Sequence, residues 1–325
     1  MHVNRGLLSW GVFLILAGVV PLAERAGLIS SDQITGWWNL WPLIVIGIGV
    51  GLVLSRTSFA VLGSLIVAGT FGVMLGAFLA VGINGFTGGV CGDDRGTSSF
   101  AEQTGTFDGP AEVSVEFNCG ELDIAGAAGT SWTFGGTGDA AHAPIVEADG
   151  DSLRIRAVER SFVPFASSGE GWQVAVPDGV ALGLRVQLNA GRASVAPGAG
   201  ELRDVRLQVN AGAIVADLSE ATAIDSIDVQ TNAGSASVTL PAASMDGRVQ
   251  VNAGSIELCT SPEAGLRIRT GGGLGGNNFG DAGLEQSGDT WESPGYADAP
   301  AQIDLDAEAN LGSITLNPDD GCDQP

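Results

Sequence analysis

The chain has 325 residues, 45% of them hydrophobic, and a formal net charge of −23. Residues 1–90 contain three arginines and two acidic residues, so nearly all of the negative charge lies beyond residue 90. Such an acidic surface repels nucleic acid and anionic lipid headgroups, which argues against binding to either through that part of the chain.

Residues 1–84 are predicted to form a membrane module. Uncharged apolar stretches occupy residues 7–23, 37–55 and 58–83, and about 20 apolar residues span the hydrocarbon core of a bilayer. We therefore expect three transmembrane helices. The first stretch alone could also be a signal peptide that ends near residues 21–26, but the two further stretches favour an anchored protein.

Small residues recur along the second and third stretches at spacings that let helices pack closely. These small residues are Gly47, Gly49, Gly51, Ala68, Gly72 and Gly76. One interpretation is packing within the module, and the other is a face for dimerisation or for binding a partner. The sequence leaves both open.

The orientation of the module follows from its few positive charges. Arg5 and Arg56 lie on the same side of a three-span module, and the positive-inside rule places that side in the cytoplasm. We therefore expect a multi-pass protein of the cytoplasmic membrane, with its N-terminus inside and its acidic part outside.

The cysteines agree with this orientation, because all four follow the last predicted span. They are Cys91, Cys119, Cys259 and Cys322. An oxidising compartment would let them form disulfides, and four cysteines allow three pairings. Since Cys259 and Cys322 each follow a predicted strand, we favour the pairs 259–322 and 91–119. No Cys-x-x-Cys is present, which argues against redox chemistry.

Residues 85–110 are rich in Gly, Ser and Thr and are predicted to be a linker. Beyond them a phrase ending in Gln-x-Asn-Ala-Gly recurs four times, with its asparagines 20 to 22 residues apart. The repeated corner residues are Asn189 and Gly191, Asn210 and Gly212, Asn232 and Gly234, and Asn252 and Gly254. On both sides of each corner, apolar and mostly polar residues alternate, which indicates strand, corner and strand with one buried face.

Asn and Gly tolerate the positive φ that a tight corner needs, and a fixed period near 21 residues is typical of a β-solenoid. We therefore predict an all-β, single-stranded β-solenoid domain at 111–318, in which stacked Asn side chains have a structural role. Looser copies at 115–124 and 310–316 and a degenerate one at 266–271 raise the count to six or seven rungs. A Gly-rich insert at 272–300 is expected to leave the solenoid as a long loop, before an acidic tail at 319–325.

Two parts of the chain resemble known families. The run Gly-Trp-Trp-Asn-Leu-Trp-Pro-Leu-Ile-Val-Ile-Gly-Ile-Gly at 36–49 is similar to the membrane module of LiaF-type cell-envelope stress proteins. The segments 151–156 and 174–177, together with the Asn-Ala-Gly rungs, resemble the "toast-rack" or "putative adhesin" β-repeat domain. The resemblance implies a bacterial, non-enzymatic membrane protein that senses envelope damage, often beside a two-component sensor kinase. The four cysteines and the long insert depart from that pattern.

Candidate chemical sites are few. Apart from His2, His142 is the single histidine, and it lies in an Ala/Gly/Asp-rich segment that is typical of a solvated loop. Gly271, Gly273 and Gly276 match G-x-G-x-x-G, but no strand-to-helix context accompanies them. The carboxylates Asp304, Asp306 and Glu308 could suit calcium, although their alternation with apolar residues is typical of the wet face of a strand. We expect no catalytic residue, cofactor or metal.

The sequence therefore predicts a membrane protein without enzymatic activity, in which an extracytoplasmic β-solenoid relays to partners in the membrane. Those partners could include a sensor kinase, another membrane protein or a second copy of the chain, but not nucleic acid. The alternative is a surface adhesin or structural scaffold that assembles through its β-solenoid and uses the helices as an anchor. An enzyme with an unfamiliar site is the third and weakest reading.

Overall fold

The chain divides into two compact units, Met1–Gly89 and Val90–Pro325. The computed structural model describes residues 5–25, 41–53, 63, 65–76, 98–158, 169–271, 275–318 and 321–322.

In the first unit, helix α1 spans Arg5–Arg25, helix α3 spans Trp41–Val53, and residues 65–76 are also helical. The predicted stretch 7–23 is helical throughout, whereas the second and third are helical where they overlap described residues. Their remaining residues lie outside the described part. Of the helices that the structure describes, none combines the length and the apolar character that a membrane span requires.

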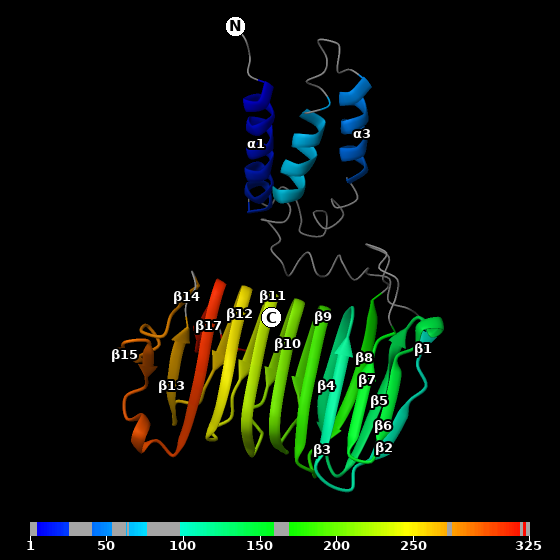
Figure 1. The fold of residues 1–325 in the computed structure, drawn as a ribbon. Helices are drawn as coiled ribbons and strands as arrows, with labels where there is room; N and C mark the ends of the chain where they lie inside the picture. Colours follow the sequence, from blue (N-terminus) through cyan, green and yellow to red (C-terminus); the bar gives the residue numbers. More distant parts are fainter. Residues whose placement is uncertain are drawn as a thin grey trace. The chain divides into compact units, whose positions relative to one another are not determined.

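Within the described residues of the second unit, five long strands form the centre and lie side by side (Figure 1), and each contains one Asn-x-Gly corner. They are β9 (Leu182–Ala196), β10 (Glu201–Asp217), β11 (Ala223–Thr239), β12 (Met245–Cys259) and β17 (Ala301–Leu316). Neighbours pair in parallel with corner opposite corner, so Gly212 lies opposite both Gly191 and Gly234. We call each such strand a rung, the part before its corner the first arm, and the part after it the second arm.

The core of the second unit follows from the alternation that the sequence carries. In β10, Leu207 and Val209 of the first arm and Ile214 and Ala216 of the second arm are buried, and the other rungs repeat this pattern. These side chains belong to one continuous hydrophobic cluster that includes both arms. Because each rung covers the apolar face of its neighbours, no rung could bury this face alone.

The N-terminal end of the stack is built from shorter strands. Strands β3 (Ala111–Phe117) and β4 (Gly120–Ala127) form a rung against β9, and β7 (Ser152–Arg156) and β8 (Glu170–Pro177) lie on the other side of that rung. Antiparallel strands then close this end: β1 (Ser98–Ser99), β2 (Gln103–Thr106), β5 (Ser131–Gly138) and β6 (Ile145–Asp149).

The C-terminal end is closed in a similar way. Strands β13 (Ala264–Gly271) and β14 (Gly276–Asn277) pair in parallel with β17, and the hairpin of β15 (Glu285–Ser287) and β16 (Thr290–Glu292) adds antiparallel strands to β13. A 3-10 turn at Tyr296–Asp298 precedes β17. The spatial order of the last rungs is therefore β12, β17, β13, which differs from their order in the chain.

Three predicted boundaries need correction. Residues 98–110 of the predicted linker belong to the β-unit, because β2 pairs with β5 and Phe107 is buried. Residues 275–300 of the predicted loop fold onto β13 and β17, with Phe279 buried against Trp291. The predicted tail is anchored at Cys322, which is buried. Residues 85–97, 272–274, 319–320 and 323–325 of these segments lie outside the described residues.

Candidate functional site

The corner asparagines form a ladder of side-chain hydrogen bonds along the stack. Each Nδ2 donates to the Oδ1 of the asparagine in the preceding rung, over 2.6–3.0 Å, in the order Asn310, Asn252, Asn232, Asn210, Asn189 and Asn118. In β9, β10, β11 and β12, the glutamine two residues before the corner asparagine also donates to the Oδ1 of the asparagine in its own rung. Five of the six Oδ1 atoms thus accept hydrogen bonds from the protein itself, and the row joins successive rungs to one another.

The corner glycines are required by close approach of the backbone. Gly191, Gly212, Gly234 and Gly254 have φ between 105° and 148°, a region that side chains other than glycine rarely adopt. A Cβ on Gly212 would also collide with the carbonyl oxygen of Gly191, and the same holds from rung to rung. Both conditions favour glycine over every other residue.

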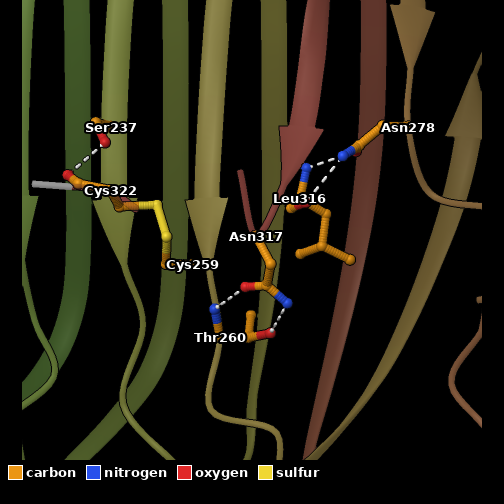
Figure 2. Close-up of a disulfide and its surroundings, with 7 residues drawn as sticks. All are labelled: Ser237, Cys259, Thr260, Asn278, Leu316, Asn317 and Cys322. Atoms are coloured by element: carbon orange, nitrogen blue, oxygen red, sulfur yellow. Dashed lines mark hydrogen bonds between the residues drawn. A yellow bond between two sulfur atoms is a disulfide. The ribbon is translucent and has the colours of Figure 1, made fainter. Parts of the chain in front are cut away.

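The C-terminal segment is fastened to the outside of the second arms (Figure 2). Cys259, the last residue of β12, forms a disulfide with Cys322, with 5.8 Å between the Cα atoms. The Ser237 hydroxyl of β11 donates to the Cys322 carbonyl oxygen over 2.6 Å. The chain turns between β17 and this segment at Asn317, whose φ is 44° and whose Oδ1 accepts from the Thr260 amide.

The pair 259–322 is the one that the sequence analysis favours. Cys119, in the corner of the β3–β4 rung, is also disulfide-bonded. Cys91, its expected partner, lies outside the described residues. The described disulfide therefore joins the end of β12 to the segment that follows β17, and Cys119 lies in the β3–β4 rung.

Of the three carboxylates of β17 that the sequence analysis weighed as calcium ligands, Asp304 and Asp306 are engaged with arginines, and Glu308 accepts a hydrogen bond from Asn310. Arg267 lies within ion-pair distance of Asp304 and Glu292, at 3.4 and 2.8 Å, and Arg269 lies 3.2 Å from Asp306. Tyr296 donates a hydrogen bond to Asp304 and its ring lies 4.0 Å under the Arg267 guanidinium. This cluster fixes the capping segment 275–300 to β13 and β17.

Two of these groups have shifted pKa values. Burial raises the pKa of the Tyr296 hydroxyl to about 12, and its hydrogen bond to Asp304 acts in the same direction. The hydrogen bond to Glu292 raises the pKa of Arg267. Both shifts favour the protonation states that the cluster needs.

The remaining sequence candidates do not come together. His142 lies in the 3-10 turn Ala140–His142, where its Nδ1 is 2.6 Å from the Asp139 carboxylate and both side chains are exposed. Gly271 ends β13 and Gly276 begins β14, and Gly273 lies outside the described residues. Among described residues, no three His, Cys, Asp or Glu side chains are grouped so that they could hold a metal ion.

The outer face of the second arms is hollowed near the N-terminal end. A cavity of about 700 Å³ crosses β5, β8, β4, β9 and β10. Its lining includes the polar residues Asp123, Gln173, Arg192 and Ser194 and the small side chain of Ala213. The lining has mixed polarity and includes the buried Trp172.

In the helical unit, the surroundings of the glycines show which of the small residues pack within the module. A Cβ on Gly72 would lie 2.6 Å from the Phe13 carbonyl oxygen, and one on Gly76 would lie 2.9 Å from that of Ala17. Gly47 similarly faces Val67. These glycines therefore pack against neighbouring helices of the same chain, whereas a Cβ on Gly49 would meet nothing within 4 Å.

Several residues that hold the β-unit together were not identified from the sequence. Ser237 lies at a position that the alternation predicts to be exposed to solvent. The interpretation of 272–300 as a loop did not identify the roles of Tyr296 and Asn278. The Asn278 side-chain amide donates to the Leu316 carbonyl oxygen and accepts from the Leu316 N–H. Asn317 precedes Pro318, and the Asn-Pro pair was an available turn signal.

Comparison with known proteins gives one family match. Residues 8–53 match the family model of the LiaI-LiaF-like transmembrane region, which confirms the resemblance of the N-terminal unit. No curated protein matches the sequence significantly.

Solved structures give distant likenesses. One is a "putative cell adhesion protein" from Clostridium sporogenes, 13% identical, with a TM-score of 0.43 over 66% of this chain and 98% of that chain. Another is a "putative adhesin" from Bacteroides fragilis, 10% identical, with a TM-score of 0.28 over 68% of this chain and 97% of that chain. We draw nothing about the function of this chain from them.

Proposed function

We propose that this chain, whose residues 8–53 match a LiaI-LiaF-like transmembrane region, is a non-enzymatic, multi-pass membrane protein of the cell-envelope stress-response type. Its β-solenoid lies outside the cytoplasmic membrane, and its helical module relays to a membrane partner such as a sensor kinase. The family match is the observation that carries the proposal. The alternative is an adhesin or scaffold that uses the helices as an anchor.

The relay would act through helix packing. Gly72 and Gly76 place the backbone of their helix directly against that of α1, and such close contacts depend strongly on shape because no side chain cushions them. A load on the β-unit that shifts one helix would change this contact, and a partner that binds the module would then meet a different surface. An anchor without a relay needs no such contact.

The test replaces Gly72 and Gly76 with Ile in the full chain and measures the transcriptional response to a cell-wall-active antibiotic in cells that lack the native copy. A Cβ alone already lies too close to the α1 backbone at both positions, so we expect the response to be lost. Gly49→Ile is the matched control, because open space surrounds that position, and it should retain the response.

Membrane abundance of each variant is measured in parallel. A full response from the Gly72/Gly76 variant at normal abundance would leave the helices as an anchor and favour the adhesin or scaffold. Gly72→Ala, a smaller perturbation at the same contact, serves if the isoleucines prevent accumulation.

A further inference from the structure

Strand β17 fills a slot between two rungs that precede it in the chain. It pairs in parallel with β12 from Met245/Ile303 to Leu258/Leu316, and with β13 from Ala264/Ala301 to Gly271/Glu308. Strand β12 uses its other edge for β11, and β13 uses its other edge for β16. Without β17, one edge of β12 and one edge of β13 would therefore lack a partner, and we call these two facing edges the slot.

The slot recognises β17 in several ways at once. Ile303, Leu305, Ile314 and Leu316 enter the core. Arg267 and Arg269 of β13 pair with Asp304 and Asp306. Asn310 extends the asparagine ladder from Asn252, and Gly312 meets the backbone of Gly254 where a Cβ would clash. The groups that the slot contacts in these ways all belong to β17, so the β17 of a second copy would satisfy the slot equally well.

Chain order makes the slot a temporary feature of folding. The rungs up to β12 and the cap strand β13 are synthesised before β17, and open strand edges pair with whatever matching strand arrives first. An element exchanged between identical chains keeps its native contacts, so exchange costs little. The competitor for the slot is therefore a second copy of this chain.

The Cys259–Cys322 disulfide lies where it can fix either outcome of this competition. Cys259 ends β12, on one side of the slot, and Cys322 follows β17 after the turn at Asn317 (Figure 2). The two sulfurs come together after β17 occupies the slot. A bond within one chain fixes the monomer, and the same bond between two chains would fix the exchanged form.

We propose that β17 is an exchangeable strand, which completes the slot of its own chain or that of a second copy, and that the Cys259–Cys322 disulfide then locks the arrangement. Closing the lock joins two thiols and releases two protons and two electrons. A disulfide of an exchange protein accepts these and becomes two thiols. The inference goes beyond the proposed function and stands whether the chain is a sensor or a scaffold.

The test uses full-length chains in their membrane. Cys259→Ala with one tag and Cys322→Ala with another are co-expressed, so that a Cys259–Cys322 bond can form in trans alone. We expect a reductant-sensitive heterodimer on a non-reducing gel, containing both tags. Neither variant expressed alone should give a dimer through this bond.

A control for random collision keeps the Cys259→Ala chain and replaces its partner by a chain with Cys259→Ala, Cys322→Ala and Ser219→Cys. Ser219 is exposed and lies in the turn after β10. The heterodimer should exceed this control about tenfold, because an exchanged strand holds the two sulfurs at a high effective concentration. Equal yields, or no heterodimer from variants that accumulate normally, would overturn the proposal.

If either variant fails to accumulate, the wild-type chain supplies the answer. Isotope-labelled and unlabelled cells are mixed, the purified full-length chains are reduced, unfolded and refolded together, and the peptides containing Cys259 and Cys322 are analysed by mass spectrometry. Mixed-isotope disulfides support exchange, and exclusively like-isotope pairs contradict it.

Discussion

At each corner, asparagine and glycine meet different physical requirements. The asparagine amide donates to one neighbouring rung and accepts from the other, so it satisfies polar groups that the stack would otherwise leave without partners. The glycine permits a positive φ and an approach of backbones that a Cβ would block. Alanine lies between them and needs neither property.

Thr231 lies at the position before a corner asparagine where neighbouring rungs have valine. It is opposite Val209 and Val251, is fully buried, and its hydroxyl has no hydrogen-bond partner among the described residues. Thr231→Val should therefore stabilise the β-unit by about 1–2 kcal/mol, because it removes an unpaired buried hydroxyl at nearly constant volume. Thermal unfolding measures this. The paired hydroxyl of Ser237 is the contrast, and Ser237→Ala should lower stability. A lower Tm for Thr231→Val would contradict the interpretation.

Tyr296 makes the C-terminal cap sensitive to alkaline pH. Its pKa is raised from 10.0 to about 12, so between these values the unfolded chain loses the phenolic proton while the folded chain keeps it. The contribution of Tyr296 to the free energy of unfolding is therefore complete below pH 10 and falls as the pH rises toward 12. The chain has one tyrosine, so tyrosinate absorbance during unfolding follows this group alone. Tyr296→Phe should flatten the decline, and an unchanged decline would assign it to other groups.

At the level of the element, parallel pairing in register restricts which charged residues can occupy equivalent positions in neighbouring rungs. Identical charged residues in successive rungs would stack like charges about 4.8 Å apart. One row of the first arms alternates in sign: Arg206, Asp228, Arg248, Asp306 and Arg269 lie opposite one another in that order. Like charges lie opposite each other at Arg185 and Arg206 and at Asp246 and Asp304. Identity between repeats is kept at the neutral corner, where stacking like on like is favourable.

Asp228→Arg tests this restriction. It removes the 3.2 Å contact with Arg206 and places four arginines, at positions 185, 206, 228 and 248, in successive rungs. We expect a loss of about 1 kcal/mol at low salt, since these side chains are exposed, and a smaller loss at high salt because screening weakens the repulsion. Asp228→Asn, which removes the attraction without adding charge, should cost less. Urea unfolding at both salt concentrations measures the loss of stability. A loss of the same size at low and high salt would refute the electrostatic account.

For the whole molecule, the central prediction is the side of the membrane on which the β-unit lies. Cys322 is buried and its thiol would react poorly even after reduction, so an engineered cysteine is the better probe. Glu220→Cys, exposed after β10, should react with an impermeant maleimide on intact cells without reductant. The wild-type chain gives the background, because the described cysteines are disulfide-bonded.

Arg5→Cys is the control for the opposite side and should react after lysis alone. Labelling of Glu220→Cys that also requires lysis would place the β-unit in the cytoplasm. The proposed envelope contact and the disulfide lock would then both lose their basis.

The features of a single rung could be predicted from the amino-acid sequence. The alternation of apolar residues specifies two arms with one buried face, and Asn-x-Gly marks the corner, because the two-residue period of a strand and the positive φ of glycine are properties of the local backbone. The positions of Cys259 and Cys322 after strands also favoured the pair that the structure contains.

Tertiary structure alone decided the order of the rungs. Nothing local in residues 301–316 distinguishes a last rung from one inserted between β12 and β13, and nothing local in 275–300 distinguishes a loop from a cap. Those outcomes depend on which edges are left open and on contacts such as those of Arg267 with Asp304 and Glu292, which join residues far apart in the chain. A repeat fixes the unit that stacks, whereas the fit of its two ends fixes how the stack is closed.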